Sequence, residues 1–459
     1  MAKRSPWVYI PTLYFAEGLP YTVVMMMSAV YFKDLGASNV LIGLTSALQL
    51  PWMLKFAWAP LIDFFGRKKH WIVVAQVVLT ILFIALALSS ISTDPVNFGI
   101  AVLAITALAS ATHDASIDGY YLEALEPSQQ ALFVGVRNTA FRLSMIFGSG
   151  AMVCLAGSLT AQTGKSLAWM TAFLVIAAVM LLGTVLHAFY LPNKSQEQQE
   201  EVPQAAALAL ALADSKASNG RDDAAANNGS NNGVNGSSTS SRTQHPPRNY
   251  LNAILSYFAQ PGAIAIVFYI LLFRLGDAMV MKMIPPFLQD PIAKGGMNLS
   301  VQTVGQIYGT VGVGFLLLGG IVGGYLVSKQ GLKRWFWPAT LVMNGTIVLY
   351  WLLAVFHPQS ILWIYVVNSL EQFGYGFGMA AYTVFLLSTV SQEYKAAHYA
   401  VATALMALGL MVPGMASGYV YEAIGYANFF LLSFLITVPG MISICFLPVW
   451  KKETKAAVS

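Results

Sequence analysis

Long apolar stretches recur along the chain and restrict it to folds that a membrane accepts. A helix needs roughly 20 mostly apolar residues to cross a bilayer, and the 459 residues contain twelve such stretches in two groups of six. Only 10% of the residues are charged, whereas soluble domains carry about 25%. This argues against a soluble enzyme or a nucleic-acid-binding module, and we expect an all-α integral membrane protein. The stretches are 7–32, 40–62, 71–89, 95–125, 131–155 and 167–191, then 261–288, 301–327, 335–356, 361–390, 396–421 and 427–449.

The basic residues between these stretches lie mainly on one side of the predicted membrane. Outside the central segment, twelve Lys and Arg residues share the side of both termini, while Lys33, Lys165 and Lys294 lie on the other side. Short cytoplasmic loops are enriched in Lys and Arg. We therefore expect both termini to lie in the cytoplasm.

A polar segment separates the two groups of helices. Its second part is a low-complexity run rich in Ala, Asn, Gly and Ser, a composition that cannot bury enough apolar surface to offset the entropy of ordering. We predict an N-terminal six-helix bundle at 1–192, a flexible cytoplasmic linker at 193–249 and a C-terminal six-helix bundle at 250–459. Paired bundles of this kind hold a substrate near the membrane midplane and move against each other for alternating access.

Ionisable residues inside the predicted helices mark candidate functional positions, because a charge in hydrocarbon is costly. In the fourth stretch, Asp114 and Asp118 are four residues apart and share a helix face with Tyr121. Two carboxylates this close cannot both ionise cheaply, so we expect one to hold a proton unless a cation intervenes. Arg142 is the expected counter-ion, and His113, about 100° round the helix from Asp114, is a candidate relay. Proton coupling and a static network that fixes helix packing both remain open.

The remaining intramembrane polar residues are candidates for binding a substrate. In the first stretch, Tyr14, Glu17 and Tyr21 share a face, and a carboxylate flanked by phenols suits either proton binding or hydrogen bonding to a sugar or amide. Tyr121 is counted with them. Lys55 is expected to reach the membrane surface instead, and Arg137 to anchor a loop. In the second half the candidates are Arg274, Asp277, Lys282, Glu371 and Tyr375.

Three of these second-half candidates have alternative interpretations. Arg274 and Asp277, three residues apart, can simply neutralise each other. Lys282 lies near the outer end of its stretch, where it can attract an anionic substrate or extend its ammonium to the membrane surface. Glu371 and Tyr375 share a stripe on a glycine-rich helix, and we expect Glu371 to face a cavity.

The connection after the second stretch carries Asp63, Gly66, Arg67 and Lys68. A short glycine-containing turn with basic residues suits a tight hairpin whose charges bridge to neighbouring helix ends. Its pattern resembles the inter-helix signature of the major facilitator superfamily, and we predict that these four residues form a cytoplasmic gating motif.

Nucleotide and metal motifs are not found in the sequence. Residues 163–166 read TGKS, but Leu159 stands where a phosphate loop requires its first glycine. Cys154 and Cys445 fit no disulfide or CxxC pattern, and no second His stands at ligand spacing near His113. We expect no metal, no cofactor, no nucleotide and no nucleic acid as partners, so uphill transport must use an ion gradient.

Several strings resemble those of the AmpG-type muropeptide permeases of the major facilitator superfamily. Residues 15–20 read FAEGLP, 55–63 read KFAWAPLID, 141–143 read FRL and 274–278 read RLGDA, while the run from His113 to Tyr120 is similar to the family's Q-D-x-x-x-D-A-W. The resemblance covers both halves and leaves out only the linker. It departs from the family at His113, at Tyr120 and in the extra carboxylate of Glu17, which leaves the exact ligand open.

This resemblance implies a major facilitator fold and a proton-coupled importer of anhydro-muropeptides, active in peptidoglycan recycling and β-lactamase induction. The partners would be a glycopeptide, protons and membrane lipid. The protein would be located in the bacterial inner membrane, and we expect it to be a monomer. The family's acids map onto Asp114 and Asp118, and its Arg onto Arg142.

Three other functions compete with a muropeptide importer. One is a related carrier for a CoA ester, a siderophore or a drug, working as an exporter if the direction is reversed. Another is a membrane enzyme such as a lipid-linked sugar transferase, which the short loops argue against, and we expect no enzyme. The third is a receptor that binds wall fragments without transporting them.

Overall fold

The computed structural model describes residues 5–64, 67–192, 250–391 and 394–447, and its regular structure there is helical throughout. The flanking parts of the chain, up to Leu191 and from Leu251, belong to one compact unit. The predicted linker at 193–249 and Gly66 of the predicted gating motif lie outside the described residues.

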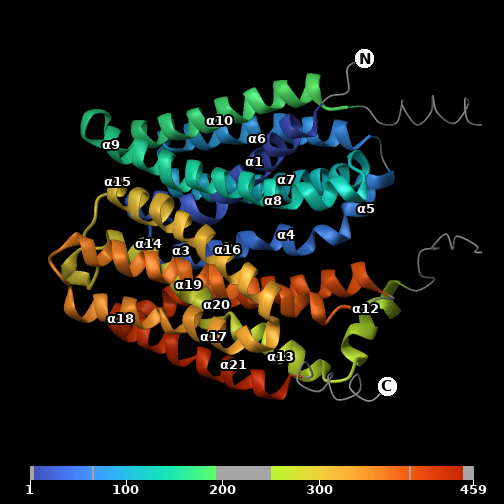
Figure 1. Ribbon diagram of the computed structural model, residues 1–459. Coiled ribbons are helices and arrows are strands. Elements are labelled where there is room, and N and C mark those ends of the chain that lie inside the picture. The colour runs from blue at the N-terminus through green and yellow to red at the C-terminus, as the bar shows by residue number, and fades with distance from the viewer. Residues whose placement is uncertain (1–4, 65–66, 193–249, 392–393, 448–459) are drawn as a thin grey trace, which may run out of the picture. The chain divides into compact units, whose positions relative to one another are not determined.

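The first half contains six helical runs, which we call spans 1 to 6 (Figure 1). Several are interrupted by π or 3-10 turns. Span 1 is α1 (Pro6–Thr22), η1 (Val23–Met27) and α2 (Ser28–Asp34); span 2 is α3 (Asn39–Leu44), η2 (Thr45–Gln49), α4 (Leu50–Leu54), η3 (Lys55–Ala57) and α5 (Ala59–Phe64); span 3 is α6 (Lys68–Ser89); span 4 is α7 (Pro95–Ala124); span 5 is α8 (Pro127–Met145), η4 (Ile146–Met152) and α9 (Val153–Thr163); span 6 is α10 (Lys165–Tyr190).

The second half begins with the short helix α12 (Tyr250–Ala259) and continues with spans 7 to 12. Span 7 is α13 (Ala263–Phe273) and α14 (Leu275–Gln289); span 8 is α15 (Val301–Val304), η6 (Gly305–Gly312) and α16 (Val313–Gln330); span 9 is α17 (Leu332–Gly345) and α18 (Ile347–Phe356); span 10 is α19 (Ile361–Ser388). The long helix α20 (Lys395–Leu435) holds span 11 and the start of span 12, because Gly425 has a positive φ of 72° and breaks it. Span 12 ends with α21 (Thr437–Ser443) and η7 (Ile444–Phe446), and η5 (Ile292–Lys294) lies in the connection after span 7.

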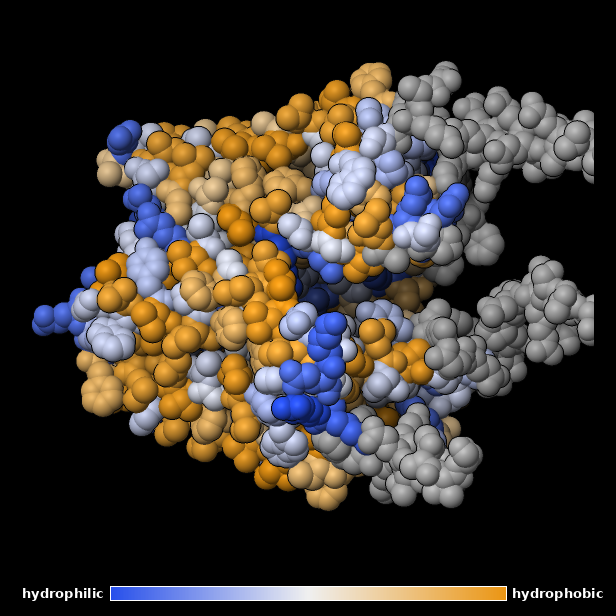
Figure 2. Space-filling view, viewed as in Figure 1, coloured by the Kyte–Doolittle hydropathy of each residue, from blue (hydrophilic) through white to orange (hydrophobic). Residues whose placement is uncertain are grey.

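The described helices are suited to a membrane by length and composition. Ten runs are long and apolar enough to cross one, and one of them, Ala397–Phe446, is divided at Gly425. With that division and the 28-residue α19, the count is consistent with the twelve predicted spans. Large apolar side chains cover much of the outer face (Figure 2), including the strongly exposed Ile264 and Phe189, and such a surface requires lipid rather than water.

The connections between spans gather at two ends. One end holds residues 35–38, 90–94 and 290–300, and there Lys33 of span 1 forms an ion pair with Asp290 after span 7; we call it the clamp end. The other end holds the connections at 125–126 and 331 and is called the terminal end, because α1 begins there and η7 ends there.

The two halves pack together mainly toward the clamp end. There α3 and η2 contact α20, and η4 and α9 contact η6 and α15. Glycine allows this approach, since a Cβ at Gly309 would stand 1.9 Å from the Ser149 carbonyl oxygen across the contact. Figure 2 shows a hollow between the halves, with hydrophilic surface inside it. The two halves are therefore in contact at the clamp end, and a space remains between them farther from it.

Candidate functional site

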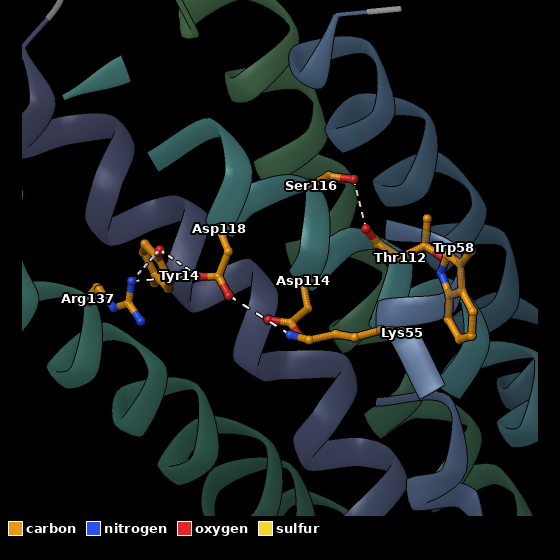
Figure 3. A network of polar contacts seen from close by, with 8 residues as sticks. All are labelled: Tyr14, Lys55, Trp58, Thr112, Asp114, Ser116, Asp118 and Arg137. Atoms are coloured by element: carbon orange, nitrogen blue, oxygen red, sulfur yellow. Dashed lines mark hydrogen bonds and ion pairs between the residues drawn. The ribbon is translucent and has the colours of Figure 1, made fainter. Parts of the chain in front are cut away.

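The two predicted acids of span 4 lie in a network of polar contacts with three neighbouring helices (Figure 3). Lys55 of η3 forms an ion pair with Asp114 and has its Nζ 4.0 Å from Asp118 Oδ2. Asp118 also accepts a hydrogen bond of 3.2 Å from the Tyr14 hydroxyl and lies 3.6 Å from Arg137 Nη1. The two acids therefore share Lys55 as a basic partner, as their common helix face predicts, and Asp118 alone also has Arg137.

The counter-ions of these acids are Lys55 and Arg137, and the expectation of Arg142 was wrong. Arg142 is five residues farther along the helix than Arg137, about 7.5 Å by the helical rise, and its Nη1 contacts Met145 Sδ at 3.1 Å. Arg137 stands level with the acids, and its guanidinium carbon lies 4.9 Å from the centroid of the Tyr14 ring. The predicted loop-anchoring role of Arg137 is therefore replaced by a contact inside the bundle.

Lys55 points into the bundle because span 2 is not a regular helix there. Residues Lys55–Ala57 form a 3-10 turn between two short helices, and Trp58 directly after it donates a hydrogen bond of 3.2 Å from Nε1 to Thr112 Oγ1 on α7 (Figure 3). This fastens the turn to span 4, and the Lys55 ammonium meets Asp114 rather than the membrane surface.

Glu17 of α1 joins the same group, which the sequence did not indicate. Carboxylate oxygens of Glu17, Asp114 and Asp118 all lie within 4.8 Å of one another, and the Glu17 side chain is buried with its Oε2 lacking a hydrogen-bond partner. Three acidic side chains spaced in this way can hold a cation in principle, but here the Lys55 ammonium already binds among them.

His113 belongs to a different polar chain, on the side of α7 that its 100° offset from Asp114 predicts, and its role as a relay stays a prediction. Its Nε2 lies 3.0 Å from Gln76 Nε2, while Gln76 also contacts His187 Nδ1 at 2.9 Å. His187 Nε2 in turn lies 3.0 Å from Thr12 Oγ1. Consecutive positions on α7 point about 100° apart, which turns His113 toward α6 and Asp114 toward α1. A buried Gln in an otherwise apolar helix was the signal that would have revealed this chain.

In the second half, Arg274 is the centre of the polar group. It stands between α13 and α14, where its φ of −94° and ψ of −4° interrupt span 7. Its Nη2 lies 2.9 Å from Asp277 Oδ2 and donates a 3.1 Å hydrogen bond to the Tyr375 hydroxyl. Arg274 and Asp277 do neutralise each other, and both are buried. The ion pair thus allows the Arg274 guanidinium to be buried inside the bundle, and its hydrogen bond places the Tyr375 hydroxyl beside it.

Lys282 and Glu371 are buried without opposite charges beside them. Lys282 Nζ has no hydrogen-bond partner, so the ammonium does not reach the surface of the described structure. Glu371 accepts a 2.8 Å hydrogen bond from the side chain of the adjacent Gln372. Both side chains are more than nine-tenths buried.

Candidates from the two halves approach one another between the bundles. Tyr21 of span 1 lies close enough to Tyr375 and Arg274 for their charges to interact with its hydroxyl. The charge of Arg142 of span 5 likewise interacts with the hydroxyl of Tyr375. The Tyr21 ring is held by an edge-to-face contact with Trp52 at 5.2 Å between centroids. Residues expected to bind a substrate thus converge from both halves, and Arg142 belongs with this group.

The predicted gating motif is only partly described. Asp63 lies in α5, with nothing known of its side chain, and Gly66 is outside the described residues. Arg67 is exposed just before α6, and Lys68 at its first position forms an ion pair with Glu123 near the end of α7. The motif's lysine therefore bridges two helix ends, as expected.

The clamp end contains a second polar group, which the sequence did not reveal. Lys33 Nζ lies 2.6 Å from Asp290 Oδ1, and Asp290 also accepts hydrogen bonds of 3.0 Å from Asn39 and 2.6 Å from the Tyr426 hydroxyl. We call these four residues the clamp. Lys33, Asn39 and Asp290 border a depression of about 730 Å³ with walls from both halves.

Comparison with known proteins agrees with this architecture. Residues 12–290 match the family model of the Major Facilitator Superfamily. The chain is 28% identical to an uncharacterized protein of Haemophilus influenzae, covering 97% of this chain and 95% of that one, and 23% identical to the anhydromuropeptide permease of Escherichia coli K12, covering 93% and 77%.

Solved transporter structures share the fold. A POT family transporter in complex with 5-aminolevulinic acid superposes with a TM-score of 0.67 at 13% identity, covering 97% of this chain and 96% of that one. The nucleoside transporter NupG superposes with a TM-score of 0.64 at 14% identity, covering 97% and 98%.

Proposed function

This chain belongs to the major facilitator superfamily, and we propose that it is a proton-coupled importer of anhydro-muropeptides across the bacterial inner membrane. It is a transporter of the AmpG type rather than an enzyme. The observation that carries the proposal is that Tyr21 and Arg142 of the first half lie close enough to Tyr375 and Arg274 of the second for their charges to interact. A carrier needs such a site, since each half must release its share of contacts when the halves move apart.

The chemistry of this region suits a glycopeptide. A muropeptide offers carboxylates, amides and sugar hydroxyls, which are recognised by basic groups and hydrogen-bonding side chains around an aromatic surface. Lys282 supplies positive charge, Arg274 supplies guanidinium donors although Asp277 balances its charge, and Tyr21, Trp52 and Phe141 supply adjoining rings. The E. coli permease's name gives the substrate class, and these residues provide a physical basis for it.

The packing of the halves supports an alternating-access cycle. The halves meet at the clamp end, and the basic connections of the terminal end indicate that this end faces the cytoplasm. We infer that the structure is closed to the periplasm and that its hollow receives or releases substrate on the cytoplasmic side. Because both halves of the binding region come from one chain, a monomer suffices.

The coupling ion is proposed to be the proton, with the acids of span 4 as part of the coupling group. Asp114 and Asp118 share Lys55, and Asp118 also has Arg137 beside it, so adding or removing one proton redistributes contacts among three helices. His113 is left out of this group, because it pairs with Gln76.

Uptake into proteoliposomes tests the function directly. Purified protein is reconstituted, labelled anhydro-muropeptide is added outside, and uptake is followed with and without an inward proton gradient. We expect accumulation only with the gradient and its collapse on adding a protonophore. A CoA ester, a siderophore and a hydrophobic drug serve as competitors. Uptake of one of these in place of the muropeptide would reject the substrate, and gradient-independent accumulation would reject the coupling.

A further inference from the structure

The acidic group of the first half carries more negative charge than its partners neutralise. Glu17, Asp114 and Asp118 have oxygen atoms within 4.8 Å of one another. The basic side chains that contact this group are Lys55 and Arg137. With all three acids ionised, one negative charge is uncompensated, and such a charge inside a membrane protein is expensive.

The partners are shared unequally, and this identifies the acid that is left over. Asp114 is paired with Lys55, and Asp118 has Lys55, Arg137 and the Tyr14 hydroxyl around it. Glu17 is 8% exposed, and its Oε2 has no hydrogen-bond partner. A buried carboxylate with an oxygen that no donor satisfies is relieved by taking up a proton, and protonated Glu17 then donates to the neighbouring Asp114 carboxylate. We propose that Glu17, rather than Asp114 or Asp118, binds the coupling proton.

The groups that face Glu17 come from every helix packed around it. They are Tyr14 on its own helix, Lys55 on η3, Asp114 and Asp118 on α7, and Arg137 on α8. Arg137 and the Tyr14 hydroxyl are engaged with each other and with Asp118. Lys55 is therefore the cation for which Glu17 competes, and Asp114 is its competitor.

Proton uptake at Glu17 has a direct structural consequence. The proton arrives from water by way of Asp118, whose side chain is 42% exposed, and adds to a Glu17 oxygen with no other bond broken. When Glu17 is neutral, Lys55 stays paired with Asp114. When Glu17 is ionised, its negative charge competes with Asp114 for the Lys55 ammonium. Lys55 belongs to span 2, and the α3, η2 and α4 segments of that span pack on α20 of the other half. The protonation state of Glu17 thus acts on a helix that contacts both halves.

Infrared difference spectroscopy tests the assignment without a substrate. The C=O stretch of a protonated buried carboxyl is followed in detergent-purified protein as pH is raised. All variants are made in a Glu371→Gln background, because Glu371 is a second buried carboxyl that would absorb in the same region. In that background we expect a band that disappears on deprotonation, that persists in Asp114→Asn and in Asp118→Asn, and that is missing at every pH once Glu17→Gln is added. A band that persists in Glu17→Gln and is lost in either aspartate variant would overturn the proposal.

Two further measurements complete the test. Glu17→Asp keeps the carboxyl and should shift the band, which guards against misfolding of Glu17→Gln. Loss of the band on adding Na⁺ at constant pH would mean that the site takes a metal cation, and would overturn the proton assignment.

Transport separates this inference from the proposed function on which it rests. Glu17→Gln should reduce muropeptide accumulation driven by a proton gradient at least about tenfold and reduce gradient-independent exchange much less. Equal accumulation in variant and parent would contradict the inference. If the parent itself moves no muropeptide, the proposed substrate fails while the infrared result still decides where the proton binds.

Discussion

Lys33 Nζ of span 1 lies 2.6 Å from Asp290 Oδ1 at the end of span 7, so this ion pair links the two halves of the molecule. The two side chains are only 13% and 4% exposed, and Asp290 also accepts from Asn39 and Tyr426. A buried pair of this kind is costly to break one-sidedly, by about 3–5 kcal/mol. The clamp is therefore a sizeable part of the energy that keeps this end closed.

Removing one clamp charge should open the clamp end. Cys154 reports on this, because its Sγ lies 3.4 Å from the Gln302 carbonyl oxygen across the contact between α9 and α15. In a Cys445→Ser background, Lys33→Gln should raise the maleimide labelling rate of Cys154 at least about tenfold, the factor that 1.4 kcal/mol produces.

The matched control for the clamp variant is Lys165→Gln. Lys165 pairs with Asp34 at 2.9 Å, but both residues belong to the first half. Labelling should stay at the parent rate, because no contact between the halves is lost. Equal acceleration in both variants would show that general destabilisation, rather than opening, exposes the thiol.

A methyl group at Gly309 should prevent the halves from closing. Its Cβ would stand 1.9 Å from the Ser149 carbonyl oxygen and 2.4 Å from the Gly150 amide nitrogen, and these backbone atoms cannot rotate away. Overpacking typically costs about 1–3 kcal/mol, so Gly309→Ala should slow uptake severalfold and speed labelling of Cys154. Gly314→Ala on the same span, where a Cβ meets nothing within 4 Å, should behave like the parent. Normal uptake in Gly309→Ala would refute this account of the contact.

Replacing Lys282 should stabilise the protein while weakening substrate binding. Its buried ammonium has no hydrogen-bond partner, and an apolar side chain of similar length removes that penalty, so Lys282→Met should raise the free energy of unfolding by about 1–3 kcal/mol. Thermal denaturation in detergent measures this, and calorimetric titration with anhydro-muropeptide should show an affinity at least about tenfold lower. The exposed Lys294→Met is the control and should change neither. A less stable Lys282→Met with unchanged affinity would remove Lys282 from the site.

The Gln76 chain should prove structural. Gln76→Leu leaves His113 and His187 without their shared partner, which should lower the free energy of unfolding by about 1–3 kcal/mol. The proton dependence of uptake should not change, because the acids lie elsewhere. Gln289→Leu, which removes a bond only to Pro285 in the same helix, should cost much less. A changed pH profile in Gln76→Leu would return His113 to the coupling route.

The spans and the shared face of Asp114 and Asp118 were predictable because they depend on local order. Apolar length locates a span, and residues four apart share a face in any regular helix. Family membership followed from strings that lie in these same helices, and the matching family model confirms it. The predicted linker and the roles of the individual site residues stay predictions.

The partners of the acids were not predictable, because they come from helices that are distant in sequence. Lys55 is 59 residues from Asp114, and it meets that acid only because η3 interrupts span 2. The choice of Arg137 over Arg142 depends on the depth at which span 5 packs beside span 4. The Lys33–Asp290 contact depends on which end of the bundles is closed, a property of the conformation and not of either helix.

The π-helical turns of spans 5 and 8 set a limit on how this sequence can change. Segments η4 and η6 pack against each other between the halves, and each is followed by further helix, α9 after η4 and α16 after η6. Deleting one residue before either turn would rotate everything beyond it by about 100°. A Cβ at Gly157 would stand 2.2 Å from the Gln302 amide nitrogen of the other half. After such a deletion, a bulkier neighbouring residue would take the place of Gly157 in this contact. Divergent forms of this protein should accordingly tolerate substitutions in these spans far better than insertions or deletions.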